Sequence, residues 1–195
     1  MRPSSESPDW GGPSAIMNIG MNNLRYEELK QRLGADAASS IYINFVQAYS
    51  LHVARLDPDI FNPVETQNSA ALAKVLEIYE NETEHEFPQD ITKQLSEVLR
   101  SMARTWESTT ARLLRQAKGA PLDAGLGLVI QVMAFGLGEG ECGTGTLQLI
   151  DENDGKAKIK GRYKEQSQIR PEKFSEGALY SVSYTHLTLP TNSGV

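Results

Sequence analysis

The sequence predicts an α+β fold in which an all-helical block is followed by antiparallel strands. Glycine is absent from Ala35 to Lys118, and half of the 16 glycines then fall between Gly119 and Gly145. Because glycine weakens helices and permits unusual backbone angles, the middle of the chain is predicted to be helical and the next part to contain strands and tight turns. The spacing of apolar residues changes in the same place, from three- and four-residue steps to short apolar runs.

Five helices are predicted where apolar residues recur on one face, as Ile41, Phe45 and Tyr49 do in the second. Gly34 is well placed to end the first helix, and Asp90 can cap the fourth. The predicted ranges are 25–33, 36–56, 67–79, 90–106 and 108–118.

Three strands are predicted after the helical block. Residues 127–135 form a short, apolar, partly β-branched run that is typical of a buried strand. Residues 144–150 and 156–163 are predicted to pair as a hairpin, with residues 151–155 as its turn. Residues 1–22 show no clear period.

Composition excludes several classes of protein. The net charge is −6 without a compensating cluster of Lys and Arg, which argues against nucleic acid or an anionic membrane as the main partner. No run of apolar residues is long enough to span a bilayer, and no signal-type segment follows Met1. Cys142 is the single cysteine, so an internal disulfide is excluded. We therefore expect a cytoplasmic protein.

Few residues suggest catalysis on their own. His52 and His85 have no partner at metal-ligand spacing, and Cys142 is better explained as a small packed thiol than as a nucleophile. The glycine-rich run 136–145 joins two predicted strands and could bring backbone N–H groups against phosphate oxygens. A flexible connection between strands explains this run equally well.

The strongest resemblance to known proteins lies around this run. The string from Gln131 to Gly136, followed by Gly143–Gly145, resembles the ATP-binding region of the pyruvate, phosphate dikinase family. That family has a Val-Gln-x-Met-Val-Phe-Gly strand that leads into Ser-Gly-Thr-Gly. The related phosphoenolpyruvate synthases match these strings less well.

Further matches keep the order of the family. They are Arg2, the Asn-Ile-Gly-Met-Asn string at 18–22, the Phe-Pro-Gln-Asp string at 87–90, and Trp106. The resemblance covers about residues 2–168.

The resemblance implies part of an ATP-grasp domain with an all-helical insertion. In the family this domain binds Mg²⁺ and ATP and phosphorylates a histidine on a separate swivelling domain. A third domain then passes the phosphoryl group to pyruvate and yields phosphoenolpyruvate. Such transfer depends mostly on positioning and on charge neutralisation by cations. The family also implies a possible homodimer.

The resemblance assigns ATP contacts but no catalytic residue. Arg2 corresponds to an arginine on the ATP phosphates, a role that suits a guanidinium. Gln131, Met133 and the Phe135–Gly136 turn correspond to the strand that borders the adenine pocket. A plain core strand is the alternative explanation, and for Met133 the two are equally good. The ATP-binding residues implied by the resemblance are Arg2, Gln131, Met133, Phe135, Gly136, Gly143, Thr144, Gly145 and Gln168.

Several positions depart from the family. Arg162 stands where the family has a glutamate of the metal–phosphate site, so no metal ligand is assigned, and a cation there should repel Mg²⁺. Residues 149–152 replace a Thr-Arg-Asn-Pro string, and Glu6 replaces a basic residue. The glycine-rich lysine segment expected before Arg2, the phosphohistidine domain and the pyruvate-binding domain are not in this sequence.

The first hypothesis is therefore a fragment of a dikinase-like phosphotransferase that is inactive alone. The alternatives are a degenerate, non-catalytic nucleotide-binding or regulatory module and a plain helical interaction protein. The expected domains are 1–23, the start of the nucleotide-binding region; 24–120, the helical insertion; 121–180, the β-rich part; and 181–195, a tail. This tail has no charged residue and resembles a translated sequencing adapter, or else a disordered terminus.

Overall fold

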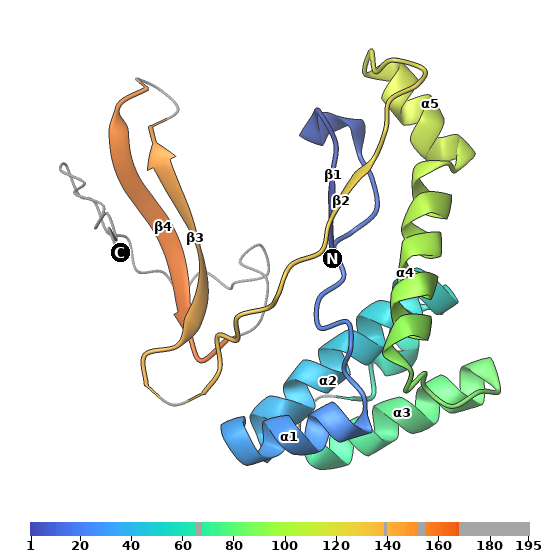
Figure 1. Ribbon diagram of the computed structural model, residues 1–195, viewed down its shortest axis with the longest axis vertical. Coiled ribbons are helices and arrows are strands. Elements are labelled where there is room, and N and C mark those ends of the chain that lie inside the picture. Colours follow the sequence, from blue (N-terminus) through green and yellow to red (C-terminus); the bar gives the residue numbers. More distant parts are fainter. Residues whose placement is uncertain (65–67, 139, 152–154, 168–195) are drawn as a thin grey trace. The chain divides into compact units, whose positions relative to one another are not determined.

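The computed structural model describes residues 1–64, 68–138, 140–151 and 155–167 (Figure 1). The chain divides into two compact units, Met1–Met133 and Ala134–Val195. The first, the helical unit, contains the helices and a short pair of strands. The second, the hairpin unit, contains a two-stranded antiparallel sheet. The predicted tail, 181–195, lies outside the described residues.

All five predicted helices are confirmed. Four of the α-helices begin after a polar residue whose side chain accepts a hydrogen bond from the backbone N–H three residues later. Asp90, for example, accepts from the Lys93 N–H at 2.7 Å. Helix α2 is the exception, because it follows directly on Gly34. Gly34 has φ of 85°, which glycine adopts without strain. The helices are α1 (Asn23–Leu33), α2 (Ala35–Tyr49), α3 (Ser69–Thr83), α4 (Ile91–Trp106) and α5 (Thr109–Ala117), with short helical turns η1 (Pro8–Trp10), η2 (Ser50–Ala54) and η3 (Pro58–Phe61).

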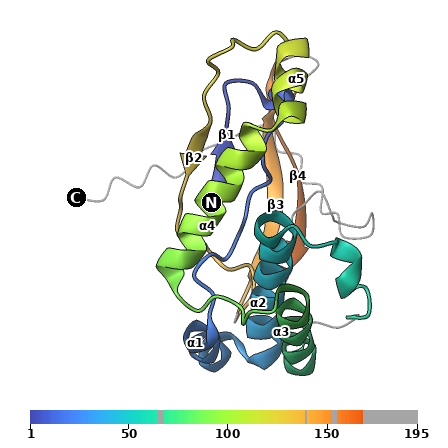
Figure 2. The same ribbon diagram turned by 90° about the vertical axis from the view of Figure 1, so that its right-hand side faces the viewer.

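Helix α2 packs against both α1 and α3, and α4 leads away from these three to α5 (Figures 1 and 2). In the part of the chain that the structure describes, no helix is both long and apolar enough to cross a membrane.

The core of the helical unit is a cluster of aromatic rings around Phe87. The Phe87 ring lies 5.2 Å from the ring of Tyr79, 5.3 Å from Tyr49, 5.6 Å from Phe45 and 5.9 Å from Tyr42, measured between centroids. All four contacts are edge-to-face, a geometry that aromatic quadrupoles favour. The loop before α4 is therefore fixed by burial of one ring between α2 and α3.

A buried glutamine ties this loop to the N-terminal segment. Gln94 is 0% exposed; it accepts a hydrogen bond from the Gly20 N–H at 2.9 Å and donates to the carbonyls of Met21, at 2.9 Å, and Pro88, at 2.6 Å. These three bonds satisfy a side chain that would be costly to bury alone.

Trp106 ends α4 and is buried at 4% exposure. The Arg115 guanidinium lies 3.7 Å from the centroid of this ring and donates to the Trp106 carbonyl at 2.7 Å. The indole N–H of Trp106 donates to the Ala124 carbonyl at 3.3 Å. Arg115 is therefore a structural residue that links α5 to the end of α4.

The predicted buried strand over 127–135 is wrong in both length and burial. Strand β2 covers only Gly127–Val129 and pairs antiparallel with β1 (Arg2–Ser4). If the ladder continued, Met1 would pair with Ile130. Instead, the Met1 amino group donates to the Ile16 carbonyl at 2.7 Å, and the Met1 carbonyl accepts from the Ile16 N–H at 3.0 Å. The strand ends because its partner ends, and Ile130 and Val132 are 62% and 95% exposed.

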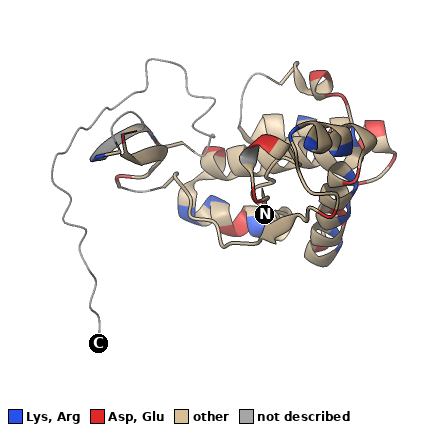
Figure 3. Cartoon of the chain, turned by 90° about the horizontal axis from the view of Figure 1, so that it is seen from above, with Lys and Arg blue, Asp and Glu red and all other residues tan. Residues whose placement is uncertain are grey.

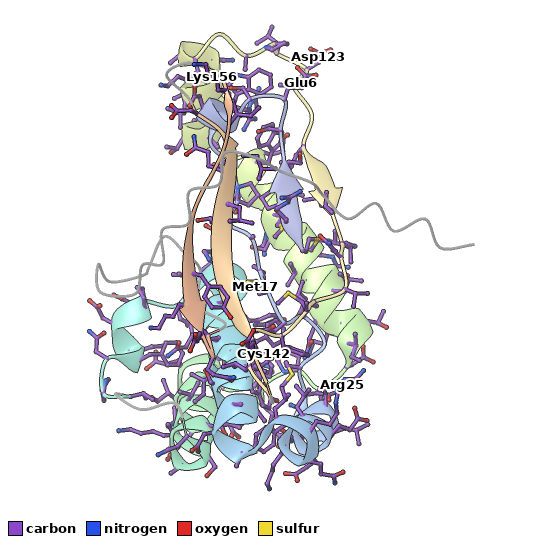
Figure 4. The ribbon with its side chains drawn as sticks, turned by 90° about the vertical axis from the view of Figure 1, so that its left-hand side faces the viewer. Glu6, Met17, Arg25, Asp123, Cys142 and Lys156 are labelled. Carbon is purple, nitrogen blue, oxygen red and sulfur yellow. The ribbon has the colours of Figure 1, made fainter. Side chains whose placement is uncertain are left out.

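The two strands of the predicted hairpin are confirmed, and residues 152–154 of its predicted turn lie outside the described residues. Strand β3 (Gly143–Ile150) pairs antiparallel with β4 (Ala157–Glu165), with an irregularity between Gln148 and Ile150. Figure 4 labels Cys142 and Lys156, which mark the two ends of this hairpin. Asp151 donates its N–H to the Lys156 carbonyl at 2.9 Å and so closes the turn end.

Candidate functional site

The residues expected to bind ATP divide between the two units. Arg2, Gln131 and Met133 belong to the helical unit, and Phe135, Gly136, Gly143, Thr144 and Gly145 belong to the hairpin unit. Gln168 lies outside the described residues.

In the helical unit, Arg2 lies on β1 opposite Val129. Its side chain is exposed and takes part in none of the ion pairs found in the described residues. Gln131 is exposed and Met133 is half-buried, and both follow the end of β2. Arg2 is thus a solvent-facing cation on a two-stranded sheet. Gln131 and Met133 lie beyond the paired part of β2.

In the hairpin unit, Gly136 is buried because the chain approaches it closely. A side-chain carbon there would lie 2.7 Å from the Gly143 carbonyl oxygen and 2.7 Å from Thr144 Oγ1, and would collide with the Ser167 carbonyl oxygen. Thr144 Oγ1 donates to that same Ser167 oxygen. Packing within the unit therefore accounts for glycine at 136 and for the hydroxyl at 144.

The glycine-rich run is organised by Gln166, a residue that sequence reasoning missed. Its Oε1 accepts a hydrogen bond from the Gly138 N–H at 3.1 Å, and its Nε2 donates to the carbonyls of Gly138, at 3.0 Å, and Gly140, at 3.1 Å. The Cys142 N–H also donates within the run, to the Gly140 carbonyl at 3.0 Å. Two backbone donors that could have faced phosphate oxygens are therefore already engaged. The sequence offered one weak sign of this role, which is that Gln166 is a polar residue shortly after a predicted strand.

The two faces of the hairpin differ in chemistry. On one face, Tyr163 and Leu147 lie over glycines: a carbon added at Gly143 would come within 2.5 Å of the Tyr163 ring, and one at Gly161 within 2.6 Å of Leu147. The other face takes the alternate positions. Its paired positions are Thr144 with Lys164, Thr146 with Arg162, and Gln148 with Lys160. We call these six positions the cationic face.

The cationic face contrasts with the charge pattern elsewhere. Figure 3 shows basic and acidic residues mixed over the helices. In the cationic face, by contrast, every β4 position carries a basic residue and every β3 position a hydroxyl or an amide. Of the β3 side chains, the Thr144 hydroxyl already donates to the Ser167 carbonyl.

Mg²⁺ does not fit these residues. It requires oxygen ligands, usually including a carboxylate. In the part of the chain that the structure describes, no group of three or more His, Cys, Asp and Glu residues could hold a metal ion. The β4 position at which the dikinase family has a glutamate is Arg162, paired with Thr146. At this position of the sequence a basic residue therefore replaces a carboxylate.

A separate hollow of about 640 Å³ lies in the helical unit, between η2, α3 and α4. Its lining includes Tyr49, Tyr79 and Glu97, and none of the expected ATP-binding residues. The Tyr49 hydroxyl donates to Glu97 Oε2. Burial, and then this bond to a carboxylate, raise the pKa of Tyr49 well above its usual value. This hydroxyl therefore stays protonated and belongs to the core.

No family model matches the chain, whereas comparison with curated proteins finds a distant similarity. Over 172 residues the chain is 26% identical to the pyruvate, phosphate dikinase of Clostridium symbiosum. The match covers 78% of this chain and 20% of that protein, so the chain spans about a fifth of the length of its relative. This distant similarity suggests a family of kinases or phosphotransferases.

Proposed function

We propose that this chain is the ATP-binding portion of a pyruvate, phosphate dikinase-like phosphotransferase. The observation that carries the proposal is the similarity to the Clostridium symbiosum dikinase over most of this chain. The strings at 87–90 and 131–136 support it as well, because they resemble strings of the dikinase family and keep their order.

Basic residues give the proposal its chemistry. Arg2 is exposed and has no ion-pair partner in the described residues, and the sequence has a basic residue at three alternate positions of β4, 160, 162 and 164. Guanidinium and ammonium groups bind phosphate oxygens through charge-assisted hydrogen bonds. In this proposal the domain has the ATP-grasp fold, and the whole enzyme phosphorylates a histidine on a swivelling domain. The acceptor histidine and the pyruvate site belong to other parts of that enzyme.

The direct test is binding of ATP to the purified chain, measured by equilibrium dialysis with radiolabelled ATP. We expect saturable binding, and about tenfold weaker binding after Arg2→Gln, the usual loss for one charge-assisted hydrogen bond. Arg32→Gln is the matched control, because Arg32 is exposed near the end of α1. Absence of binding at millimolar ATP would overturn the proposal.

A second assay tests the claim that this portion is incomplete. The chain, supplied with ATP and pyruvate, is expected to form no phosphoenolpyruvate. Formation of phosphoenolpyruvate would show that the chain carries its own acceptor and pyruvate site.

The alternative is a degenerate nucleotide-binding module that has a regulatory role and catalyses no phosphoryl transfer. Arg162 favours it, because a cation replaces the carboxylate with which the dikinase family serves its metal. Under this alternative, Arg162→Glu creates a dependence of ATP binding on Mg²⁺ that the unmodified chain lacks. If the unmodified chain already transfers a phosphoryl group from ATP, the alternative fails.

A further inference from the structure

The hollow between η2, α3 and α4 has the size and lining of a small-molecule site. Its volume is about 640 Å³, and ligand pockets usually measure roughly 300–1,000 Å³. Tyr49 and Tyr79 are among its lining residues and are 1% and 6% exposed. Ala54 and Ala103 also line it, and their small side chains leave the space open. A ring-sized apolar group can therefore be accommodated in this hollow.

Two arginines of α4 line the same hollow, and neither has a counter-ion. Arg100 and Arg104 are four residues apart, so their side chains leave one face of the helix about 6 Å apart. Both residues are exposed, and neither guanidinium forms an ion pair or a hydrogen bond in the part of the chain that the structure describes. Like charges at this spacing repel each other, so an anion that contacted both would stabilise them.

The one acidic residue of α4, Glu97, is directed elsewhere. It lines the same hollow three residues before Arg100, a spacing that permits an ion pair on a helix. Its Oε2 instead accepts the hydrogen bond of the Tyr49 hydroxyl. Burial, and then the charge of Glu97, raise the pKa of Tyr79. The carboxylate is thus held beside the tyrosines, and the two guanidinium groups are left to an anion from outside.

A further wall of the hollow is η2, which is a π-helical turn directly after α2. Such turns are rare and are frequent at functional sites. This one ends at Arg55, whose φ of 62° lies in the left-handed region that favours glycine. It places Val53 and Ala54 at the hollow, and the Ser101 hydroxyl of α4 donates to the His52 carbonyl. The two walls are therefore fixed to each other, so the hollow exists without a ligand.

We propose that this hollow binds a small organic acid whose oxyanion pairs with Arg100 and Arg104. The apolar, ring-sized body of the acid lies against Tyr49 and Tyr79. A guanidinium suits a carboxylate or a phosphate ester, because both present two oxygens to its parallel donors. The site is separate from the ATP contacts of the proposed function, because none of those residues lines it.

The test is a titration of the isotope-labelled full chain with hydrocinnamate, followed by NMR of the backbone amides. We expect saturable shifts at residues 53, 54, 100 and 104. The dissociation constant should be about 1 mM, as for a fragment-sized ligand. Hydrocinnamyl alcohol lacks the charge and propionate lacks the ring, so each should bind at least about fivefold more weakly. Equal binding of the alcohol, or no saturable shift with hydrocinnamate, would overturn the proposal.

A second probe, phenyl phosphate, shows which oxyanion the site takes. Tighter binding than that of hydrocinnamate would identify a phosphate ester, and weaker binding would identify a carboxylate; either result supports the site. Added sodium chloride should weaken the binding of both probes, because exposed guanidinium groups are screened. Binding that is independent of salt would show that the arginines do not hold the anion.

Variants of the lining show whether the two arginines are responsible. R100Q/R104Q should lose at least about tenfold in affinity for hydrocinnamate. R100K/R104K should lose less, about threefold, because the charge remains while the planar fork is removed. A103W adds a ring at an exposed lining residue without a change of charge and should block the hollow. Unchanged affinity in R100Q/R104Q, measured on a chain with unchanged helical circular dichroism, would contradict the proposal.

A matched control removes the same charge elsewhere in the helical unit. Arg32 of α1 and Arg112 of α5 are exposed and are not among the lining residues. R32Q/R112Q should change the affinity less than about twofold, because distant exposed charges are screened. A loss equal to that of R100Q/R104Q would mean that net charge alone is measured, and the proposal would fail.

Measuring ATP binding in R100Q/R104Q separates this site from the proposed function. Loss of hydrocinnamate binding with ATP binding retained supports two distinct sites. Loss of both would show that the two ligands share one site, and the separate site would fail. If ATP does not bind even the unmodified chain, the proposed function fails while the hydrocinnamate titration still decides this proposal.

Discussion

The helical unit and the hairpin unit are held together by different forces. In the helical unit, Phe87 and four other aromatic rings pack at the centre, and Gln94 satisfies three backbone groups without exposure to water. The hairpin unit has a two-stranded ladder, and Leu147 on it is 72% exposed. Two strands bury little apolar surface, so backbone hydrogen bonds and glycine contacts dominate there.

This difference separates the residues in the dikinase-like strings by what accounts for them. Phe87, Asp90 and Trp106 lie in such strings, and burial, helix capping and ring stacking account for all three. The packing of the helical unit therefore explains them without a ligand. The exposed Arg2 is not explained in this way.

The largest effect is expected at the centre of the helical unit. Phe87→Ala should lower the free energy of unfolding by about 3–5 kcal/mol, because it removes a buried ring and leaves a cavity. Urea denaturation followed by helical circular dichroism measures this. Leu24→Ala, at a side chain 72% exposed, is the control and should change stability by less than about 0.5 kcal/mol. Similar losses in both variants would mean that the aromatic cluster is not the core.

The next largest effect is expected on the stability of the hairpin unit. Gly136→Ala should destabilise it by about 1–3 kcal/mol, because the new carbon meets the Gly143 oxygen and Thr144 Oγ1 at 2.7 Å. Hydrogen exchange of the β3 amides should accelerate while exchange in α2 stays unchanged. Gly125→Ala is the control, since no atom lies within 4 Å of the added carbon. Unaltered β3 exchange would show that the close approach is not required.

A pH titration sharpens the comparison in the helical unit. Burial and the bond to Glu97 raise the pKa of Tyr49, so the folded state keeps its proton above the ordinary tyrosine value of about 10. The stabilisation is complete below pH 10 and declines as the pH rises further, because the unfolded chain releases the proton first. Urea denaturation between pH 9 and 11 should show a smaller loss for Tyr49→Phe than for the unmodified chain. Tyr26→Phe is the control and should follow the unmodified chain.

The smallest effect is local to the glycine-rich run. Gln166→Ala removes three hydrogen bonds to Gly138 and Gly140. It should cost less than about 1 kcal/mol because the site is exposed. Exchange of the Gly138 amide, followed by NMR, should become faster. Gln116→Ala, at an exposed residue of α5, should leave this exchange rate unchanged. An unchanged rate in Gln166→Ala itself would show that the Gln166 hydrogen bonds do not hold the glycine-rich run.

Local signals were sufficient to predict the helices and the hairpin. The polar caps, the three- and four-residue spacing and Gly34 act within a few residues of the chain, so they are visible in the sequence. The strand over 127–135 was wrong because a strand needs a partner, and Met1 is bonded to Ile16 instead of extending β1. Pairing is a property of two segments and cannot be read from one.

The candidate site was predictable only in part, for the same reason. Gln94 bonds to residues 73 and 74 positions earlier in the chain, and Gln166 to residues up to 28 positions earlier. Neither choice of partner follows from local composition. Glycine at 136 suggested a ligand, whereas the close approach of the chain explains it. The alternation of basic residues along β4 was present in the sequence, but it became a face only once the register with β3 was known.

The short pairing of β2 has a consequence for handling the protein. Residues 128–133, Leu-Val-Ile-Gln-Val-Met, contain neither charge nor proline, and Val132 is 95% exposed. Leu128 and Val129 pair with β1, and in the part of the chain that the structure describes residues 130–133 have no strand partner. Such a segment is a template for strand addition between molecules, the first step of cross-β assembly. At high concentration these six residues are where self-association should begin, and one lysine at 132 should suffice to suppress it.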